Sequence, residues 1–136
     1  MNSTRIGDIG VSHIIARCME LDIPVYIPFS DNEKADLIII LNNKPLKVQV
    51  KTSNKDSTDT SEFRLYSSTS AIYQRKSIKH CYTPEEVDLF LLYDIPRQQI
   101  YCVPFEEKIG DTIVLRHTPT KNNQQKGIKW AKDYIF

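Results

Sequence analysis

The sequence predicts an α/β fold in which a mixed β-sheet is flanked by helices. Three observations predict it: an amphipathic helix near the start, several apolar or alternating segments of strand length, and a short helix at the end. The chain has 136 residues, which is enough for one core. We therefore expect residues 1–136 to form a single domain.

The first predicted elements are a helix and a short strand. Residues 8–21 are predicted to be helical because apolar residues recur at the spacing of one buried face: Val11, Ile14, Ile15 and Cys18. Pro24 favours the end of this helix. Residues 23–29 are a predicted strand, which Pro28 closes.

The next segment predicts a hairpin. Residues 36–41 are apolar on both faces, as expected of a central strand. A tight Asn-Asn-Lys-Pro turn at 42–45 leads into a second strand at 46–52. This strand alternates, so one of its faces carries three polar side chains: Lys47, Gln49 and Lys51.

The rest of the chain contains further strands and several polar segments. Strand composition is found at 63–67, 87–93, 99–103 and 112–116. Residues 53–62 are polar without an apolar anchor and are predicted to be a loop. The basic segment 69–80 fits either a helix or a loop, and Thr83-Pro84-Glu85-Glu86 fits the start of a helix or a turn. After a polar stretch, 127–134 is a predicted short helix.

The net charge of +1 says little until it is divided along the chain. Residues 44–80 carry 8 basic and 3 acidic side chains, and residues 112–136 carry 5 and 1. If the fold brings these segments to one side, they form a phosphate-binding surface; otherwise they are scattered solvated side chains. The sequence has no signal-like or membrane-spanning apolar run, so we expect a cytoplasmic protein. Its cysteines are expected to be buried reduced thiols: Cys18, Cys81 and Cys102.

The hairpin also suggests chemistry. Asp36 opens its first strand, and the turn folds Lys51 back toward the level of Asp36, on the same face as Gln49. A carboxylate, an amide oxygen and an ammonium group together can hold a divalent metal and steady an attacking water. An ordinary half-exposed strand has the same pattern, and the residues alone favour that ordinary interpretation.

The order of these residues resembles the core of the PD-(D/E)XK nuclease superfamily, with Gln49 where most members carry Asp or Glu. The segment Val48-Gln49-Val50-Lys51-Thr52 resembles the corresponding segment of the group I intron-associated homing endonuclease branch. Further segments fit that branch: Gly7-Asp8-Ile9-Gly10-Val11, Ile23 to Phe29, Tyr93, Tyr101-Cys102-Val103-Pro104, Leu115-Arg116 and Ile128 to Tyr134. The resemblance therefore covers nearly the whole chain.

The resemblance implies a restriction-endonuclease-like fold and an endonuclease that cleaves double-stranded DNA with Mg²⁺ or Mn²⁺. It implies Asp36 as a metal ligand, Gln49 as a weak ligand or water-orienting group, and Lys51 as an aid to the water or the transition state. Many members carry a helix Glu that this chain replaces with Val11. Asp8 either supplies that ligand from one turn back or only caps the helix.

Candidate phosphate contacts lie mainly in the two basic segments: Lys47, Lys55, Arg64, Arg75, Lys76, Lys79, Arg116, Lys121 and Lys126. Members of the branch act as oligomers, so a homo-oligomer, either a dimer or a tetramer, is implied. Other functions stay open. They are a catalytically inactive DNA-binding module on the same fold, a restriction or junction-resolving nuclease, and a small protein-interaction domain.

Overall fold

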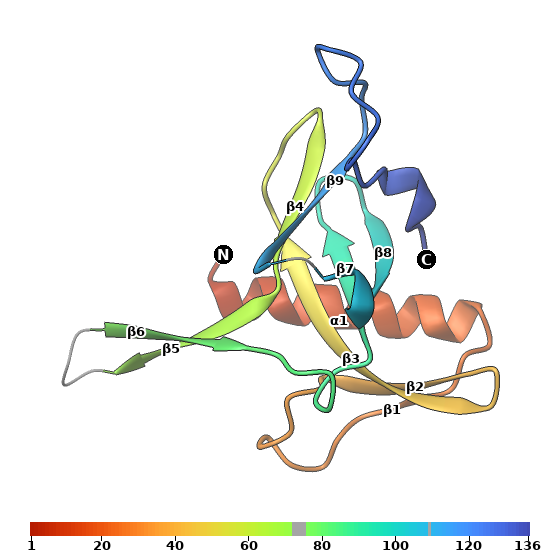
Figure 1. The fold of residues 1–136 in the computed structure, drawn as a ribbon. Coiled ribbons are helices and arrows are strands. Elements are labelled where there is room, and N and C mark those ends of the chain that lie inside the picture. The colour runs from red at the N-terminus through yellow and green to blue at the C-terminus, as the bar shows by residue number, and fades with distance from the viewer. Residues whose placement is uncertain (72–75, 109) are drawn as a thin grey trace.

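The centre of the protein is a five-stranded mixed sheet. The computed structural model describes residues 1–71, 76–108 and 110–136. The strands of the sheet are β1 (Val25–Tyr26), β2 (Leu37–Leu41), β3 (Lys44–Ser53), β7 (Leu89–Asp94) and β8 (Gln99–Pro104). They lie in the order β1-β2-β3-β7-β8, with β3 and β7 parallel and every other pair antiparallel (Figure 1). The predicted α/β class with a mixed sheet is confirmed.

Helix α1 (Ser3–Glu20) crosses one face of this sheet (Figure 1). It begins at Ser3 rather than at residue 8, because the Asn2 side chain accepts the N–H of Arg5 at 2.9 Å and caps it. A Cβ atom at Gly10 would lie 1.8 Å from Thr52 Oγ1, so only glycine lets the helix approach β3 this closely. No helix in the described ranges is long and apolar enough to cross a membrane.

Strands, not helices, cover the opposite face. The antiparallel pair β4 (Thr60–Arg64) and β9 (Thr112–Arg116) lies over it and closes a second core: Phe63, Leu65, Tyr82, Phe90, Leu92, Tyr101, Val103, Ile113 and Leu115. The predicted helix at 127–134 is wrong, because this segment contains only the 3₁₀ turn η2 (Ala131–Asp133). The segment 83–86 is a turn without a following helix. The strands predicted at 99–103 and 112–116 are confirmed.

A two-stranded arm projects from the body (Figure 1). It consists of β5 (Tyr66–Ala71) paired antiparallel with β6 (Lys76–Cys81). The prediction of a helix or loop at 69–80 is therefore wrong for the described residues, and the single strand predicted at 63–67 is divided between β4 and β5. The predicted loop 53–62 is also too long, because β4 already begins at Thr60.

The β2–β3 hairpin sets up the candidate site. Asn42 and Asn43 have φ values of 52° and 62°, so they form a two-residue left-handed turn, and the predicted turn residues 44 and 45 belong to β3. The register of β2 with β3 ends at Leu37 and Val48. Beyond Val48, β3 continues to Ser53 with β7 as its partner on the other side. The last part of β3 therefore has one edge that β2 does not cover.

Candidate active site

Asp36 occupies the point where β2 stops covering β3. Its backbone N–H donates to the carbonyl of Val48 at 2.8 Å, and its carboxylate Oδ2 accepts the N–H of Val50 at 2.9 Å. The side chain thus satisfies a backbone group that the end of β2 leaves open. This contact fixes the carboxylate beside the segment that carries Gln49 and Lys51.

Gln49 is buried, with 7% of its surface exposed. Its Oε1 has no hydrogen-bond partner among the described residues, and its Nε2 makes only a long contact of 3.5 Å with the carbonyl of Val50. Burying an amide oxygen without a partner is costly, so such an atom in a native fold calls for an explanation. Here the atom lies on the strand that Asp36 caps.

Lys51 is half-buried and held at two points. Its ammonium donates to the carbonyl of Tyr66 at 2.9 Å and lies 5.1 Å from the centre of the Tyr82 ring. Burial lowers the pKa of Lys51, an effect that the negative charge of Asp36 opposes. Burial also raises the pKa of Asp36, against the Val50 N–H and the positive charge of Lys51. The two groups therefore sit in one water-poor environment and influence each other.

A cleft of about 700 Å³ opens beside the uncovered edge of β3. Its lining comes from the first turns of α1, the end of β3, β4 and the start of the arm. Lys51, Lys55 and Arg64 bring three positive charges to it. Glu62 also lines the cleft and pairs with Lys55 at 3.1 Å. The predicted loop at 53–62 gave Glu62 no role, although the alternation of polar and apolar residues over 61–65 is a strand signal.

Asp8 is exposed on α1 and, like Asp36 and Gln49, does not line the cleft, to which the helix contributes Ser3, Ile6 and Gly7. The alternative expectation, that Asp8 caps the helix, is wrong because Asn2 does so. Val11 packs against the core on the helix side of the sheet. The structure thus holds Asp36 against the segment of β3 that carries Gln49 and Lys51, and Asp8 as a further metal ligand stays a prediction.

The candidate phosphate contacts fall into separate groups. Lys79 lies at the arm, paired with Asp111 and over the Tyr66 ring, 4.4 Å from its centre. Lys47 binds the carbonyl of Glu85 in a different hollow. A further group follows from the second basic segment. The guanidinium of Arg116 binds the carbonyls of residues 118 and 119, and Lys121 and Lys126 are exposed after β9. Arg75 and the side chain of Lys76 lie outside the described part of the chain.

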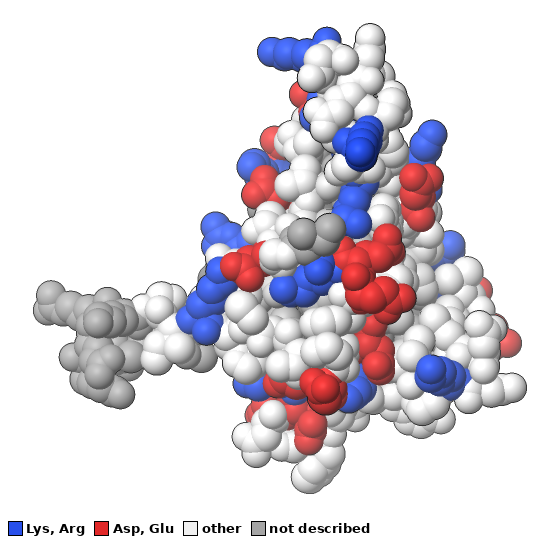
Figure 2. All heavy atoms as spheres, in the orientation of Figure 1, with Lys and Arg blue, Asp and Glu red and all other residues white. Residues whose placement is uncertain are grey.

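Charge is unevenly distributed over the surface. Figure 2 shows Lys and Arg side chains where the arm joins the body, while Asp and Glu gather nearer the middle of that view and below it. The basic stretch 44–80 supplies the cleft and the arm, whereas the cations of 112–136 lie elsewhere. Only one of the two basic segments therefore borders the candidate site.

The donors at this site fit a hard divalent cation. Asp36 offers a carboxylate and Gln49 a buried amide oxygen without a partner, and oxygen is the ligand that Mg²⁺ and Mn²⁺ prefer. Among the described residues, no group of three or more His, Cys, Asp or Glu side chains could hold a metal. Mg²⁺ keeps several waters and needs only one or two carboxylates, so a sparse donor set of this kind suits it.

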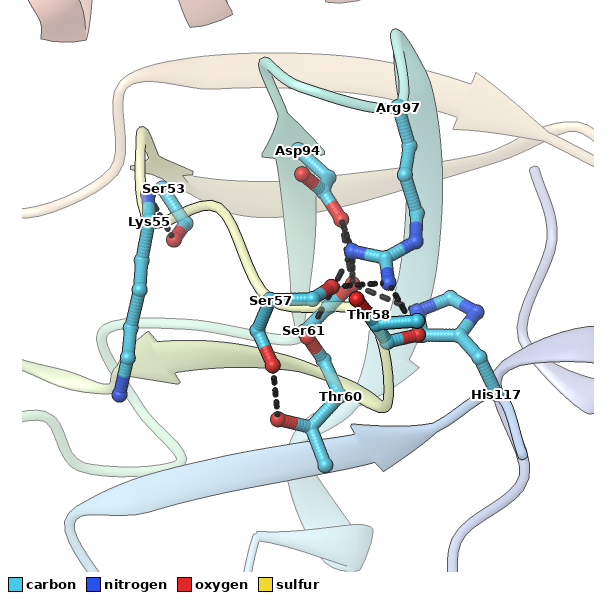
Figure 3. A network of polar contacts seen from close by, with 9 residues as sticks. All are labelled: Ser53, Lys55, Ser57, Thr58, Thr60, Ser61, Asp94, Arg97 and His117. Atoms are coloured by element: carbon cyan, nitrogen blue, oxygen red, sulfur yellow. Dashed lines mark hydrogen bonds and ion pairs between the residues drawn. The ribbon is translucent and has the colours of Figure 1, made fainter. Parts of the chain in front are cut away.

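A second polar cluster lies at the end of β7, where Asp94 is the register partner of Ser53 of β3 (Figure 3). Ser61 Oγ donates to Asp94 Oδ2 and contacts His117 Nε2 at 2.7 Å, while Arg97 Nη1 donates to Asp94 Oδ2 at 3.1 Å. Arg97 also binds the carbonyls of Ser57 and Thr58 and so fastens the loop after β3. In a hydrolase triad, His lies between Asp and Ser. Here Ser61 is in the middle and 3% exposed, so the cluster is structural.

The fold and the site together define a nuclease class built on a carboxylate, an amide and a lysine at one end of a sheet. A model of the PD-(D/E)XK endonuclease family matches residues 1–136, so the chain belongs to that family and is an endonuclease. No curated protein matches the sequence. The fold is similar to that of a solved bacterial homing endonuclease, I-Ssp6803I, with a TM-score of 0.79 at 20% identity, covering 99% of this chain and 89% of that one. The expected family and fold are thereby confirmed.

Proposed function

We propose that this protein is a Mg²⁺- or Mn²⁺-dependent endonuclease that cleaves double-stranded DNA. One observation carries the proposal. The Asp36 carboxylate accepts the N–H of Val50 and is thereby held against the segment of β3 that carries Gln49 and the half-buried Lys51. Gln49 Oε1 has no partner among the described residues, and Lys51 lines a basic cleft. These are the groups that phosphodiester hydrolysis uses, and the family membership of the chain supports the same reaction.

Asp36 and Gln49 would hold the cation in this proposal, with waters and substrate phosphate completing its shell. When bound, the cation supplies a water of lowered pKa and relieves negative charge on the phosphate. Lys51 stabilises the charge that develops on the phosphate, and its water-poor setting strengthens that interaction. Asp36 must be ionised to act, so acid should abolish activity at a higher pH than for an ordinary aspartate.

Lys55, Arg64 and Lys79 are the phosphate contacts that this proposal keeps. The first two line the cleft, and Lys79 lies on the arm that starts at its border. Contacts to phosphate are independent of sequence and depend on salt. The fold similarity to a homing endonuclease supports a target-specific duplex cutter, in which a projecting two-stranded arm is suited to a DNA groove.

We further infer that the active form contains a second copy of the chain. Tyr26, Ile27 and Phe29 are 60%, 71% and 106% exposed, and the last two line a hollow of about 570 Å³. The hollow contains both Lys34 and Glu33, so a two-fold copy could pair opposite charges and insert Phe29 into its partner. Sedimentation should show a homo-oligomer that Phe29→Asp dissociates. Ile78→Asp, at a residue 54% exposed on the arm, should leave it intact, and equal effects would overturn this surface.

The decisive experiment is cleavage of supercoiled plasmid and genomic DNA with Mg²⁺ or Mn²⁺. Wild type is compared with Asp36→Asn and Lys51→Ala, and Lys132→Ala, an exposed lysine outside the cleft, is the matched control. We expect Asp36→Asn and Lys51→Ala to lose about 100- to 1,000-fold in rate, whereas Lys132→Ala retains it. Cleavage by either site variant at the wild-type rate would refute the assignment of that residue.

The replacement of the family's helix Glu by Val11 favours a second candidate, a catalytically inactive DNA-binding module. Gel retardation over a salt series separates the two. Tight, salt-sensitive binding without cleavage under any metal condition would favour the inactive module. Metal-dependent nicking that requires Asp36 would exclude it.

A further inference from the structure

The ammonium of Lys51 is held by the two residues at which the projecting arm joins the body. Tyr66 is the first residue of β5, and its carbonyl accepts from Lys51 Nζ at 2.9 Å. Tyr82 directly follows Cys81, which ends β6, and its ring centre lies 5.1 Å from the same nitrogen. Tyr66 and Cys81 are register partners, so both contacts come from the base of the arm.

The two contacts differ in kind and together define a position. The Tyr66 carbonyl gives a directional hydrogen bond, which fixes the distance and the angle of approach. The ring of Tyr82 gives a cation–π contact, which is stronger where water is scarce. Tyr82 is only 6% exposed, and it packs edge to face on Phe90 with ring centres 6.0 Å apart. The ring is thus a fixed wall beside the lysine.

The base of the arm is itself anchored to the body. Leu65, just before the arm, is 1% exposed, and its N–H donates to the carbonyl of Asp111 at 2.6 Å. Lys79 of β6 pairs with the Asp111 side chain and covers the Tyr66 ring, 4.4 Å from its centre. A displacement of the arm base would therefore shift both partners of Lys51 together.

We propose that Tyr66 and Tyr82 are positioning residues for Lys51, so that the base of the arm sets the location of the ammonium that acts in cleavage. This inference rests on the proposed function of Lys51. It assigns Tyr82 no contact with the scissile phosphate, so its effect passes through the lysine. If a DNA duplex binds the arm and displaces its base, Tyr66 and Tyr82 would carry that displacement to the ammonium of Lys51.

Tyr82 is the residue to change, because Tyr66 acts through its main chain. Tyr82→Phe keeps the ring, and Tyr82→Leu removes it while leaving an apolar side chain. Tyr101→Leu is the matched control, since Tyr101 is a 2% exposed tyrosine of the same core, and in the described part of the chain the hydrogen bond and the ring contact of the Lys51 ammonium go to Tyr66 and Tyr82. Thermal unfolding of each variant shows the folded fraction, to which all rates are referred.

The measurements are the single-turnover cleavage rate at saturating enzyme and the DNA affinity without cleavage. We expect Tyr82→Leu to lower the rate about tenfold, the size of a desolvated cation–π contact, with DNA affinity changed less than about twofold. Tyr82→Phe should restore most of the rate, and Tyr101→Leu should lose stability without a comparable loss of rate. Equal losses in Tyr82→Leu and Tyr101→Leu, or no rescue by Tyr82→Phe, would overturn the proposal.

A second readout does not depend on activity. Proton NMR of the Lys51 side chain should show an upfield ring-current shift in wild type and in Tyr82→Phe, and its loss in Tyr82→Leu. An unshifted Lys51 in wild type would refute the contact with Tyr82. If the shift is present but no variant cleaves DNA, the proposed function fails while the positioning of the lysine by the arm base stands.

Discussion

The candidate active site and the Asp94 cluster each contain an aspartate, but Asp94 is buried and Asp36 is only half-buried, and their partners differ. Asp94 is 1% exposed, and its Oδ2 receives hydrogen bonds from Ser61 and Arg97, so its charge is met inside the protein. One oxygen of Asp36 accepts the backbone N–H of Val50. The residues on either side of Val50 are Gln49, whose amide oxygen has no partner among the described residues, and Lys51, which lines a cleft. Both regions border a hollow: Lys51 lines the cleft beside the candidate site, and Arg97 and His117 line another of about 460 Å³.

The hydrogen bonds of the two regions distinguish a structural cluster from a candidate catalytic site better than their residue types do. Ser61, His117 and Asp94 are the residue types of a hydrolase triad, but Ser61 Oγ binds both Asp94 and His117 and is not free to attack a substrate. Asp94 also leaves one oxygen, Oδ1, without a partner in the described part of the chain, as Gln49 does with Oε1. The difference lies in the hydrogen bonds, because Ser61 and Arg97 both donate to the buried Asp94, whereas the carboxylate of the half-buried Asp36 accepts one backbone N–H.

The largest effect expected from this contrast is on stability, in a matched pair of substitutions. Asp94→Asn removes the charge that Arg97 faces and should lower the free energy of unfolding by roughly 3 kcal/mol. Asp36→Asn keeps an acceptor for the Val50 N–H and should cost less than about 1 kcal/mol while cleavage is lost. Urea unfolding gives both values. Equal losses of unfolding free energy in the two variants would show that the charge of Asp94 contributes no more to stability than that of Asp36.

The next expected effect is at the contact between α1 and β3. A Cβ at Gly10 overlaps Thr52 Oγ1, so Gly10→Ala should destabilise the protein by about 2 kcal/mol. Thr52 follows Lys51 on β3, so cleavage by the folded fraction should fall as well. Thr52→Ala added to Gly10→Ala removes the colliding hydroxyl and should recover most of both losses. A double variant no better than Gly10→Ala alone would contradict this close contact as the cause.

The hairpin of the site was predictable because its signals are local. Alternation of polar and apolar residues over 46–52 placed Gln49 and Lys51 on one face, and Asn42-Asn43 marked the turn. Asp36 at the start of the strand then followed from the length of the hairpin. The family resemblance added the expectation of a metal-dependent nuclease, which no single local pattern carries.

What was missed depends on long-range packing or on weak local patterns. The arm is rich in Ser, without apolar alternation, so 69–80 gave no strand signal, and Asn2 as a cap moved the helix start. Tyr82 is far from Lys51 along the chain, and only the folded arm brings its ring to the ammonium. The hydrogen bond of Arg116 to the carbonyl of Thr118 likewise depends on the folded loop after β9.

A smaller effect should follow from restoring charge at the site. Gln49→Glu adds a second carboxylate beside Asp36, and more ligand charge means tighter binding of a hard cation. The Mg²⁺ concentration for half-maximal cleavage should fall about tenfold, and added Mg²⁺ should raise the melting temperature more than it does for wild type. Gln49→Leu, which offers no oxygen, should shift the requirement upward. An unchanged metal requirement in both variants would remove Gln49 from the metal site.

The smallest effect concerns the pH dependence of the Asp94 cluster. Burial and the positive charge of Arg97 lower the pKa of His117, against the opposing influence of Asp94. The folded protein therefore binds this proton less readily than the unfolded chain does, so stability rises with pH. The contribution is complete above the ordinary histidine pKa of about 6.5 and is lost as the pH falls through that value toward the folded pKa.

His117→Gln keeps a polar group next to Ser61 but cannot titrate. Its unfolding free energy should therefore change less between about pH 7.5 and pH 5 than that of wild type, and the difference should equal the contribution of this one histidine. His13→Gln is the control, because His13 is exposed on α1 and stacks on Tyr93 with ring centres 4.4 Å apart, away from Asp94 and Arg97. Urea unfolding at a series of pH values measures the slopes. If His13→Gln reduced the change of unfolding free energy with pH and His117→Gln did not, protonation of His117 would not destabilise the cluster, and this prediction would be refuted.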